Sequence, residues 1–484
     1  MNRGAIASHI SSHTLFNILA NFSKVIISGL LLIYVARSLG PSQYGIVSLG
    51  LSIAAIIGIF CDFGMSTSTA RFLAEHKDLR TAIYLNGRFL NLLSSFLFSL
   101  ILFLLAEPVA KSVNLPSPMY VQIMCLFTFF TSLFHFSIRS LQGIKETHKI
   151  ALLNFLHQLI TAAIIILIIH AGMKAAGVLF GHSVSAGIIC IISLIMLHKY
   201  CLNFKLELST LHLKKIFLYA LPLLLTSSSY FLVLRGPTVL LGAFAGTEEV
   251  SYLAIPLRIV EVTSLPAYSL SFVVAPFFTK KEKSTGNLPW LYVNVLKYCA
   301  LFYTPISAFI LLGANRLISG FFGTEYSNAV PVLLIFSLYI PFFAIATFSS
   351  RILDFLGIAK QKSIIFAITS AITIVASLFV IPWLKERGAA FVIAVPYTIF
   401  ALYTIIKSAR ECDIVLSKYA SHLIKLVVIT VISSVPAIMV LNNVHDIPGV
   451  ALSFATLVIC FFILATGWKL VRPSEIINII KQIF

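Results

Sequence analysis

Long apolar runs alternate along the chain with short polar segments. A helix that crosses a membrane needs about 20 mostly apolar residues. Runs of this length predict fourteen spans, at 14–36, 44–65, 87–106, 119–141, 150–170, 175–198, 215–236, 250–278, 293–314, 328–356, 363–384, 388–408, 422–441 and 447–468. The runs at 250–278 and 328–356 are longer, which predicts tilted, kinked or extended helices. The pattern therefore predicts an all-α, polytopic membrane protein.

Composition supports the same interpretation. Of the 484 residues, 59% are hydrophobic and 11% are charged, whereas a soluble domain is usually about 25% charged. The first apolar run has the length of a full span and is not followed by a small-residue cleavage site, so we expect a retained helix rather than a signal peptide. The seven cysteines form no CxxC pair, so neither a disulfide framework nor a zinc site is predicted.

The net charge of +18 is of the size that nucleic-acid-binding proteins carry, but its distribution excludes that function. With the N-terminus placed in the cytoplasm, 25 of the 35 Lys and Arg fall in cytoplasmic segments or at the span ends that border them, 6 in outside loops and 4 deeper within spans. This bias follows the positive-inside rule and predicts that both termini are cytoplasmic. The longest outside loops, such as 107–118 and 315–327, are too short for a folded domain.

Weak internal repeats divide the chain into two halves. Three pairs of segments match at offsets of 206 or 214 residues: Leu39–Ile53 with Ala245–Ile259, Gly143–Lys145 with Gly357–Ala359, and Lys174–Ala176 with Gly388–Ala390. Transporters are commonly built from such repeats, with the substrate site between them. We therefore expect two six-helix lobes of parallel topology at 1–205 and 206–412, followed by two extra helices and a cytoplasmic tail at 413–484.

Several short motifs, in order along the chain, resemble the polysaccharide transporter (Wzx-type flippase) family. They are Ala36-Arg-Ser-Leu-Gly-Pro-Ser-Gln-Tyr-Gly45, Asp62-Phe-Gly64, Arg139-Ser-Leu-Gln-Gly143, Leu356-Gly-Ile-Ala-Lys360, and Ile381-Pro382 followed by Gly388-Ala-Ala390. That family is part of the multidrug/oligosaccharidyl-lipid/polysaccharide exporter superfamily. The resemblance implies two lobes around a central cavity, alternating access, and a bacterial inner-membrane location.

The resemblance also implies a cargo. It is an oligosaccharide repeat unit on undecaprenyl diphosphate, moved from the cytoplasmic to the outer leaflet for a surface polysaccharide such as O-antigen in lipopolysaccharide. The implied partners are this lipid-linked glycan, membrane lipid, and the polymerase and chain-length regulator of the same pathway. No nucleic-acid partner and no bound cofactor are expected, and a proton or sodium gradient is a plausible source of energy.

Ionisable side chains inside spans are costly and default to functional hypotheses. Seven such residues stand out: Lys24, Asp62, Arg235, Arg258, Glu261, Arg351 and Asp354. Lys24 lies about 15 Å into the first predicted span, from the helical rise per residue. Arg258 and Glu261 are also near mid-depth, whereas Arg235 is close to the outer end of its span. Because basic groups can pair with phosphate oxygens, we predict a diphosphate-binding cavity formed by Lys24, Arg258 and Arg235.

This prediction gains weight from the family, whose flippases are similar in having basic residues in the first and eighth helices. Other roles remain open for the same side chains. Arg258 and Glu261 have i,i+3 spacing and would also neutralise each other on one helix face, while Glu261 is a candidate acid for ion coupling. Arg235 would also reach the headgroups by snorkelling.

The remaining intramembrane charges point to structure rather than transport. Arg351 and Asp354 are interpreted as a structural pair near the cytoplasmic interface. Asp62 is interpreted as a structural or gating residue, because in the family it marks a helix end. His135, His157 and His182 lie in or near spans without the spacing of metal ligands, so we interpret them as structural or incidental.

Two alternative functions fit the sequence less well than a flippase does. A drug/cation antiporter of the same superfamily would favour a cavity rich in carboxylates, whereas mid-span bases outnumber acids here. A polysaccharide polymerase or another membrane enzyme typically carries a large outside loop with catalytic residues. No Gly-rich phosphate loop, DxD sequence or Ser/His/Asp set is visible in the chain, so no catalytic residues are predicted and we expect a transporter rather than an enzyme.

Overall fold

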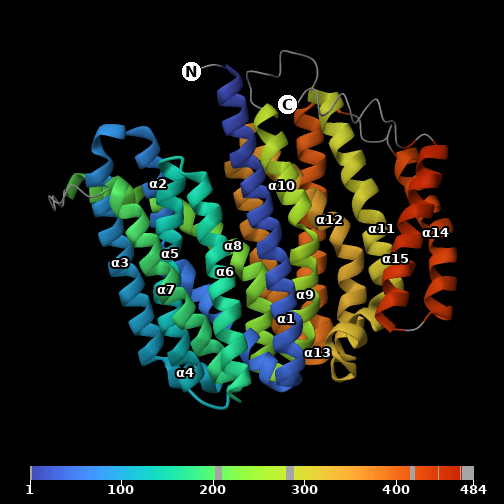
Figure 1. The fold of residues 1–484 in the computed structure, drawn as a ribbon, viewed down its shortest axis with the longest axis horizontal. Coiled ribbons are helices and arrows are strands. Elements are labelled where there is room, and N and C mark those ends of the chain that lie inside the picture. The colour runs from blue at the N-terminus through green and yellow to red at the C-terminus, as the bar shows by residue number, and fades with distance from the viewer. Residues whose placement is uncertain are drawn as a thin grey trace. The chain divides into compact units, whose positions relative to one another are not determined.

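The structure, a computed structural model, describes residues 3–201, 210–278, 288–414, 420–444, 446–468 and 470. All regular elements in these residues are helices, which confirms the predicted all-α class (Figure 1). The helices before residue 246 are α1 (Arg3–Asp62), α2 (Met65–Glu75), η1 (Lys77–Leu79), α3 (Arg80–Leu104), α4 (Ala106–Ser112), α5 (Met119–Gly143), α6 (Thr147–His170), α7 (Ala175–Cys201) and α8 (Thr210–Ala245). Those after it are α9 (Thr247–Thr263), α10 (Leu265–Val274), η2 (Ala275–Phe278), α11 (Leu288–Phe322), η4 (Thr324–Tyr326), α12 (Ala329–Phe355), α13 (Ala359–Glu411), α14 (Ala420–Asn443) and α15 (Asp446–Gly467).

Twelve helical stretches in the described residues are long and apolar enough to cross a membrane. The chain is therefore a multi-pass membrane protein, as predicted. Two of the twelve, Ser23–Asp62 and Ala359–Glu411, each correspond to a pair of the predicted spans. Each of these long helices also contains a residue with non-helical backbone angles, Gly40 (φ 70°, ψ 172°) in α1 and Lys385 (φ 47°, ψ −126°) in α13.

The long run at 250–278 forms three consecutive elements rather than one helix. The α9 helix ends at Thr263, α10 begins at Leu265, and a short 3₁₀ turn follows from Ala275. Pro266 lies in the first turn of α10, where a proline is tolerated because the N–H groups there have no intrahelical acceptor. The sequence thus predicted the break in general terms, as a kink.

Contacts divide the chain into two compact units, Met1–Ser251 and Tyr252–Phe484. Helices α1 to α8 belong to the first unit and α10 to α15 to the second, while α9 begins in one and ends in the other. The predicted lobe boundary at residue 205 comes from the internal repeat and stays a prediction. The tail after residue 470 lies outside the described residues.

In the first unit, α3, α5, α6 and α7 lie side by side (Figure 1). Small polar side chains join these helices within the apolar interior. Asn91 of α3 donates to Ser132 of α5 at 3.1 Å, and Ser95 of α3 lies 2.8 Å from the same hydroxyl. Such interhelical bonds stabilise membrane helices, because lipid offers no alternative partner. The outer face of α3 is apolar, with Phe96 58% exposed, as expected for contact with lipid tails.

Two of the motif glycines allow the backbones of the first unit to approach closely. A Cβ added at Gly45 of α1 would lie 1.6 Å from the Thr247 carbonyl oxygen. A Cβ added at Gly143, the last residue of α5, would lie 2.5 Å from the Ala70 carbonyl oxygen of α2. Only glycine fits such contacts without a shift of the backbone, which gives these family motifs a packing role.

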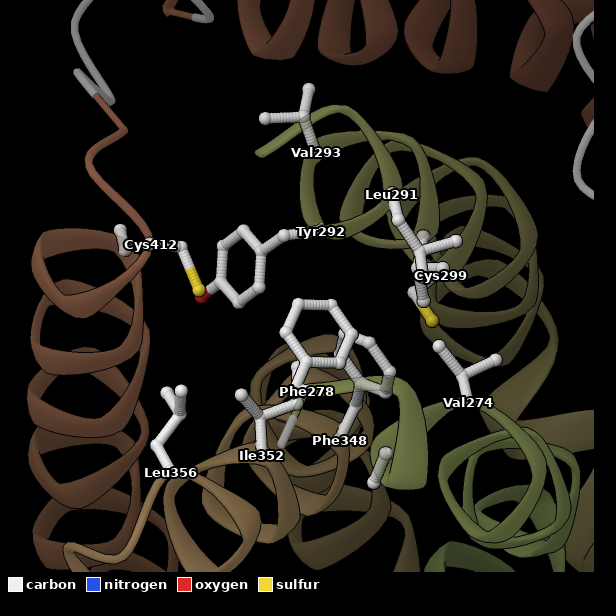
Figure 2. Close-up of a cluster of buried hydrophobic side chains, with 13 residues drawn as sticks. Val274, Phe278, Leu291, Tyr292, Val293, Cys299, Phe348, Ile352, Leu356 and Cys412 are labelled. Atoms are coloured by element: carbon white, nitrogen blue, oxygen red, sulfur yellow. The ribbon is translucent and has the colours of Figure 1, made fainter. Parts of the chain in front are cut away.

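Aromatic rings form the centre of a buried cluster in the second unit (Figure 2). The ring centroids of Phe278, Tyr292 and Phe348 lie 6.2 to 6.5 Å apart. The Tyr292 hydroxyl lies 2.6 Å from Ser408 Oγ and also donates to the Ile405 carbonyl oxygen, both on α13. The cluster therefore holds η2, α11, α12 and α13 together.

Candidate functional site

Lys24 lies on α1, which packs against α6. Its side chain is half-buried. Ten residues later on the same helix, the Tyr34 hydroxyl lies 3.0 Å from His170 Nδ1, at the last residue of α6. This contact aligns the two helices and places Lys24 about 15 Å from that end. Lys24 interacts electrostatically with His135 of α5 and His157 of α6, so it faces the interior of the first unit.

A polar stripe runs along the second half of α5. His135, Arg139 and Gln142 are all exposed, and their spacing of four and three residues places them on one helix face. Arg139 Nη1 donates to Gln142 Oε1 at 2.9 Å. Polar side chains exposed along a membrane helix face a water-filled space or the bundle interior rather than lipid. This face of α5 therefore forms a polar surface that interacts with Lys24 through His135.

Histidines from the next two helices extend this surface. His157 of α6 and His182 of α7 are half-buried and interact electrostatically with each other. Thr161 Oγ1 lies 2.7 Å from the His157 carbonyl oxygen and 3.0 Å from Ser185 Oγ, and Ser185 Oγ donates to the His182 carbonyl oxygen. These hydroxyls connect the turns of α6 and α7 that carry the two histidines.

Sequence reasoning missed this grouping. The lack of metal-ligand spacing predicts structural or incidental roles for the three histidines, yet the fold places them on three neighbouring helices, and His135 and His157 interact with Lys24. The available signal was one histidine within each of three consecutive apolar spans.

Asp62 lies at the end of α1, where the chain turns into α2. Its Oδ1 accepts hydrogen bonds from both the backbone N–H (3.3 Å) and the hydroxyl of Ser66. The Asp62 carboxylate therefore satisfies a backbone donor in the first turn of α2, as an N-terminal cap does. It also interacts electrostatically with Arg139. These contacts support the structural interpretation and connect Asp62 to the polar stripe.

Arg235 lies farther from its helix end than predicted. The predicted span stops at residue 236, but α8 continues to Ala245, so the half-buried Arg235 lies about 15 Å from that end. Pro237, two residues later, is inside the helix. The apolar pattern continues past the proline, and the helix continues with it beyond the predicted end.

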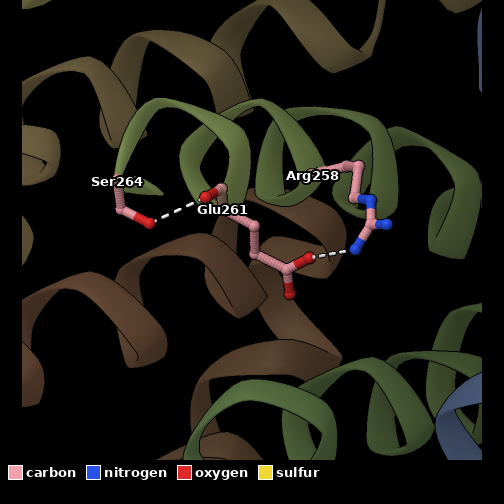
Figure 3. A network of polar contacts seen from close by, with 3 residues as sticks. All are labelled: Arg258, Glu261 and Ser264. Carbon is pink, nitrogen blue, oxygen red and sulfur yellow. Dashed lines mark hydrogen bonds and ion pairs between the residues drawn. The ribbon is translucent and has the colours of Figure 1, made fainter. Parts of the chain in front are cut away.

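In the second unit, Arg258 and Glu261 form an ion pair on one face of α9 (Figure 3). Arg258 Nη1 lies 2.7 Å from Glu261 Oε2, and the Ser264 hydroxyl donates to the Glu261 carbonyl oxygen at 2.7 Å. The Arg258 side chain is 43% exposed and that of Glu261 21%. An anionic ligand could reach the guanidinium, but in this arrangement its charge is already matched by the carboxylate.

The second pair of the sequence prediction, Arg351 and Asp354, lies near the end of α12. Arg351 is half-buried and Asp354 is exposed. Asp354 Oδ1 lies 2.5 Å from Lys362 Nζ, across the turn that leads into α13. Gly357, with a φ of 82°, forms part of this turn. The Asp354–Lys362 bond supports a structural role for the carboxylate.

Within the part of the chain that the structure describes, no three His, Cys, Asp or Glu side chains gather closely enough to hold a metal ion. Six cysteines, among them buried Cys61 and Cys299, are free thiols.

Comparison with known proteins shows what the chain resembles. A family model described as "Polysaccharide biosynthesis protein" matches residues 11–282. The Lipid II flippase MurJ, in an inward closed conformation, superposes with a TM-score of 0.75 at 15% identity over 95% of this chain and 100% of its own. An inward-facing MATE family multidrug resistance transporter of the MOP superfamily gives a TM-score of 0.61 at 14% identity, covering 81% of this chain and 94% of its own. A MATE transporter from Vibrio cholerae gives a TM-score of 0.59 at 13% identity, covering 84% of this chain and 97% of its own. No curated protein matches the chain.

Proposed function

Because the chain belongs to the polysaccharide biosynthesis protein family, we propose that it is a flippase for lipid-linked oligosaccharides. It is a transporter with the fold of the MOP superfamily, not an enzyme. The proposed cargo is an oligosaccharide repeat unit on undecaprenyl diphosphate, moved from the cytoplasmic to the outer leaflet of the bacterial inner membrane. The proposed product is a surface polysaccharide of the O-antigen type, which a polymerase and a chain-length regulator then extend.

The observation that carries this proposal is the basic surface around Lys24. Lys24, Arg139 and three histidines come from four helices of the first unit. A diphosphate needs cationic partners when it leaves water. A cationic drug would instead need carboxylates. The surface therefore favours an anionic lipid head group over the drug cargo of the MATE transporters that share this fold.

Three basic residues have proposed roles in binding the diphosphate. Lys24 pairs with phosphate oxygens at mid-depth, and Arg235 contributes a second charge from within α8. Arg258 binds the phosphate by exchanging its partner, because its guanidinium is held by Glu261 in this arrangement. Glu261, once released, becomes able to bind an ion, which makes it the candidate for coupling to a proton or sodium gradient.

The proposed transport cycle is alternating access between two lobes. The first lobe, residues 1–205, holds predicted spans 1–6, and the second, residues 206–412, holds predicted spans 7–12. Residues 413–484 form two extra spans and a tail. The proposed topology has fourteen spans, because the two long helices interrupted at Gly40 and Lys385 would each cross the membrane twice. A helix of 53 residues such as α13 would be about 80 Å long if straight, far more than the roughly 30 Å hydrocarbon core. An even number of spans places both termini on the same side of the membrane, and the charge bias favours the cytoplasmic side.

Deletion of the gene tests the proposal. The expected result is loss of the surface polymer and accumulation of undecaprenyl-diphosphate repeat units on the cytoplasmic leaflet. Complementation with Lys24→Met should not restore the polymer, whereas Lys111→Met should, because Lys111 is 76% exposed on α4 and pairs with Glu107 there. Normal glycan in the deletion strain would overturn the proposal and favour the drug/cation antiporter.

A further inference from the structure

The short helix α2 and the two residues before it pack against the first turns of α8, within the first compact unit. Ser68 Oγ of α2 donates to the Ile216 carbonyl oxygen of α8 at 2.8 Å, and both residues are buried. We call the packing of residues 63–72 on residues 216–220 the α2–α8 contact. It has no role in the transport scheme so far.

Aromatic and basic side chains extend the α2–α8 contact. The rings of Phe63 and Phe217 stack with their centroids 5.8 Å apart, and Phe72 meets Tyr219 edge to face at 5.9 Å. Arg71 Cζ lies 4.4 Å from the centroid of the same Tyr219 ring. The negative face of an aromatic ring attracts a guanidinium in this position. Tyr219 is therefore held by two neighbouring residues of α2.

The α2 helix is attached to the rest of the first unit more firmly than to α8. Leu73 of α2 belongs to a cluster of eleven buried residues that includes side chains of α3, α5, α6 and α7. Among the described residues, the buried cluster that α2 shares with α8 has three members, Met65, Ile216 and Ala220. A contact with few buried apolar groups opens at a lower cost in free energy. Opening is therefore expected between α2 and α8, with α2 kept on the first unit.

The α8 helix can bend just beyond the α2–α8 contact. Pro222 lies inside the helix, and a proline there removes a backbone hydrogen bond and favours a kink. Near the other end of α8, Asn114 Nδ2 donates to the carbonyl oxygens of Gly242 and Ala243 at 3.1 and 2.8 Å. From the rise per residue, this attachment lies about 40 Å along the helix from Ile216. One end of α8 can therefore detach while the other stays in place.

The proposed topology places the α2–α8 contact at the cytoplasmic face. Two predicted spans precede α2 and six precede α8, so both helices begin on the side of the N-terminus. The proposed lobe boundary at residue 205 also lies between α2 and α8, so the contact joins the two proposed lobes. In alternating access, contacts between lobes at one face break when that face opens.

We propose that the α2–α8 contact is a latch, which closes the cytoplasmic side and releases in each transport cycle. The inference rests on the proposed function and adds a named contact to its opening step. Release separates Arg71 from the Tyr219 ring and Ser68 from the Ile216 carbonyl oxygen. The attachment at Asn114 stays formed meanwhile. Arg71 and Tyr219 are thus positioning residues for the closed state rather than ligands of the cargo.

Cross-linking tests the latch. Purified full-length Phe72→Cys, Tyr219→Cys protein is bridged with a short bis-maleimide in detergent, and intact mass confirms the bridge. The protein is then placed in vesicles with a fluorescent undecaprenyl-diphosphate-linked oligosaccharide, and flipping is followed. We expect the untreated variant to flip the lipid and the bridged variant to lose flipping. The matched control is Tyr34→Cys, His170→Cys, because those two rings lie 6.2 Å apart on α1 and α6, both within the first proposed lobe, and its bridged form should still flip.

The outcomes separate the latch from the proposed function. Flipping that persists in the bridged Phe72→Cys, Tyr219→Cys protein would overturn the latch and leave the flippase proposal in place. If the unaltered protein does not flip the lipid, the proposed function is wrong, and thiol labelling then tests the latch alone. Ser68→Cys should react with N-ethylmaleimide faster than Ser140→Cys, since Ser140 is equally buried near the end of α5 but away from the latch. Equal rates would overturn the latch, and this measurement also decides if the double variant fails to fold.

Discussion

Replacement of Gly45 by alanine should force α1 away from the start of α9. The added Cβ would lie 1.6 Å from the Thr247 carbonyl oxygen and 2.5 Å from the carbonyl carbon. Cβ atoms essentially never approach another heavy atom closer than 3.0 Å, so the two backbones must separate by about 1.4 Å. Because both partners are main chain, no side chain can rotate to make room. Overpacking of this kind costs about 1–3 kcal/mol, and we expect about 3 kcal/mol here.

Thermal unfolding of the purified protein in detergent measures this effect. The fraction that remains monodisperse on size-exclusion chromatography is followed against temperature for the unaltered protein and the variant. Gly29→Ala is the matched control, since it lies in the same helix and an added Cβ there has nothing within 4 Å. We expect a lower midpoint for Gly45→Ala and an unchanged one for Gly29→Ala.

Equal midpoints for Gly45→Ala and the unaltered protein would refute the packing argument for this motif. A second position gives an independent test of the same reasoning. At Gly143, an added Cβ would lie 2.5 Å from the Ala70 carbonyl oxygen and 3.0 Å from its Cα. Gly143→Ala should therefore also lower the midpoint, by separating α5 from α2.

Three further predictions concern individual polar contacts. Glu261→Gln releases Arg258 from its ion pair. Calorimetry should therefore show up to about fivefold tighter binding of the lipid diphosphate, the equivalent of about 1 kcal/mol for a partly exposed pair. Weaker binding would contradict the partner exchange of Arg258. Ser132→Ala removes the hydroxyl that Asn91 and Ser95 of α3 share. The variant should be less stable in the same thermal assay by about 0.6 kcal/mol, the average for such bonds in membrane helices. An unchanged unfolding midpoint would show that these bonds do not stabilise the packing of α3 on α5. Tyr292→Phe removes the bond to Ser408 and should cost about 1 kcal/mol; a more stable variant would show that this hydroxyl does not hold α13.

The presence of the helices could be predicted from the sequence, because each has to supply an apolar surface of about one membrane thickness. The first and last residues were less predictable. Arg235 shows the reason: the apolar pattern continues past Pro237, and the helix continues with it to Ala245. Conversely, the apolar run at 250–278 continues past Ser264, where the helix stops. Apolar length predicts burial in lipid, but local backbone geometry decides where a helix ends.

The candidate site was only partly predictable for a different reason. An intramembrane charge such as Lys24 is visible in the sequence because it is costly in lipid. Its neighbours are not visible, because His135, His157 and His182 come together only through the packing of α5, α6 and α7. Pairs within one helix, such as Arg258 and Glu261, were predictable because i,i+3 spacing places them on one face.

The family motifs were recognisable in the sequence, but their physical role was not. In the sequence, Gly45 and Gly143 stand out only as members of short motifs. The structure shows that each allows a helix backbone to contact another backbone closely. The partner segments begin more than 70 residues away for Gly143 and about 200 for Gly45, so no local pattern could identify them.

Lipid flipping in reconstituted vesicles tests the central claim most directly. The purified chain is placed in vesicles that hold a fluorescent undecaprenyl-diphosphate-linked oligosaccharide in both leaflets, and a membrane-impermeant reductant is added outside. If the chain is a flippase, the reductant quenches label from both leaflets, and Lys24→Met vesicles lose only the outer-leaflet signal. If vesicles with the folded, unaltered chain also lose only the outer-leaflet signal, the protein does not move this lipid and the proposed function is wrong.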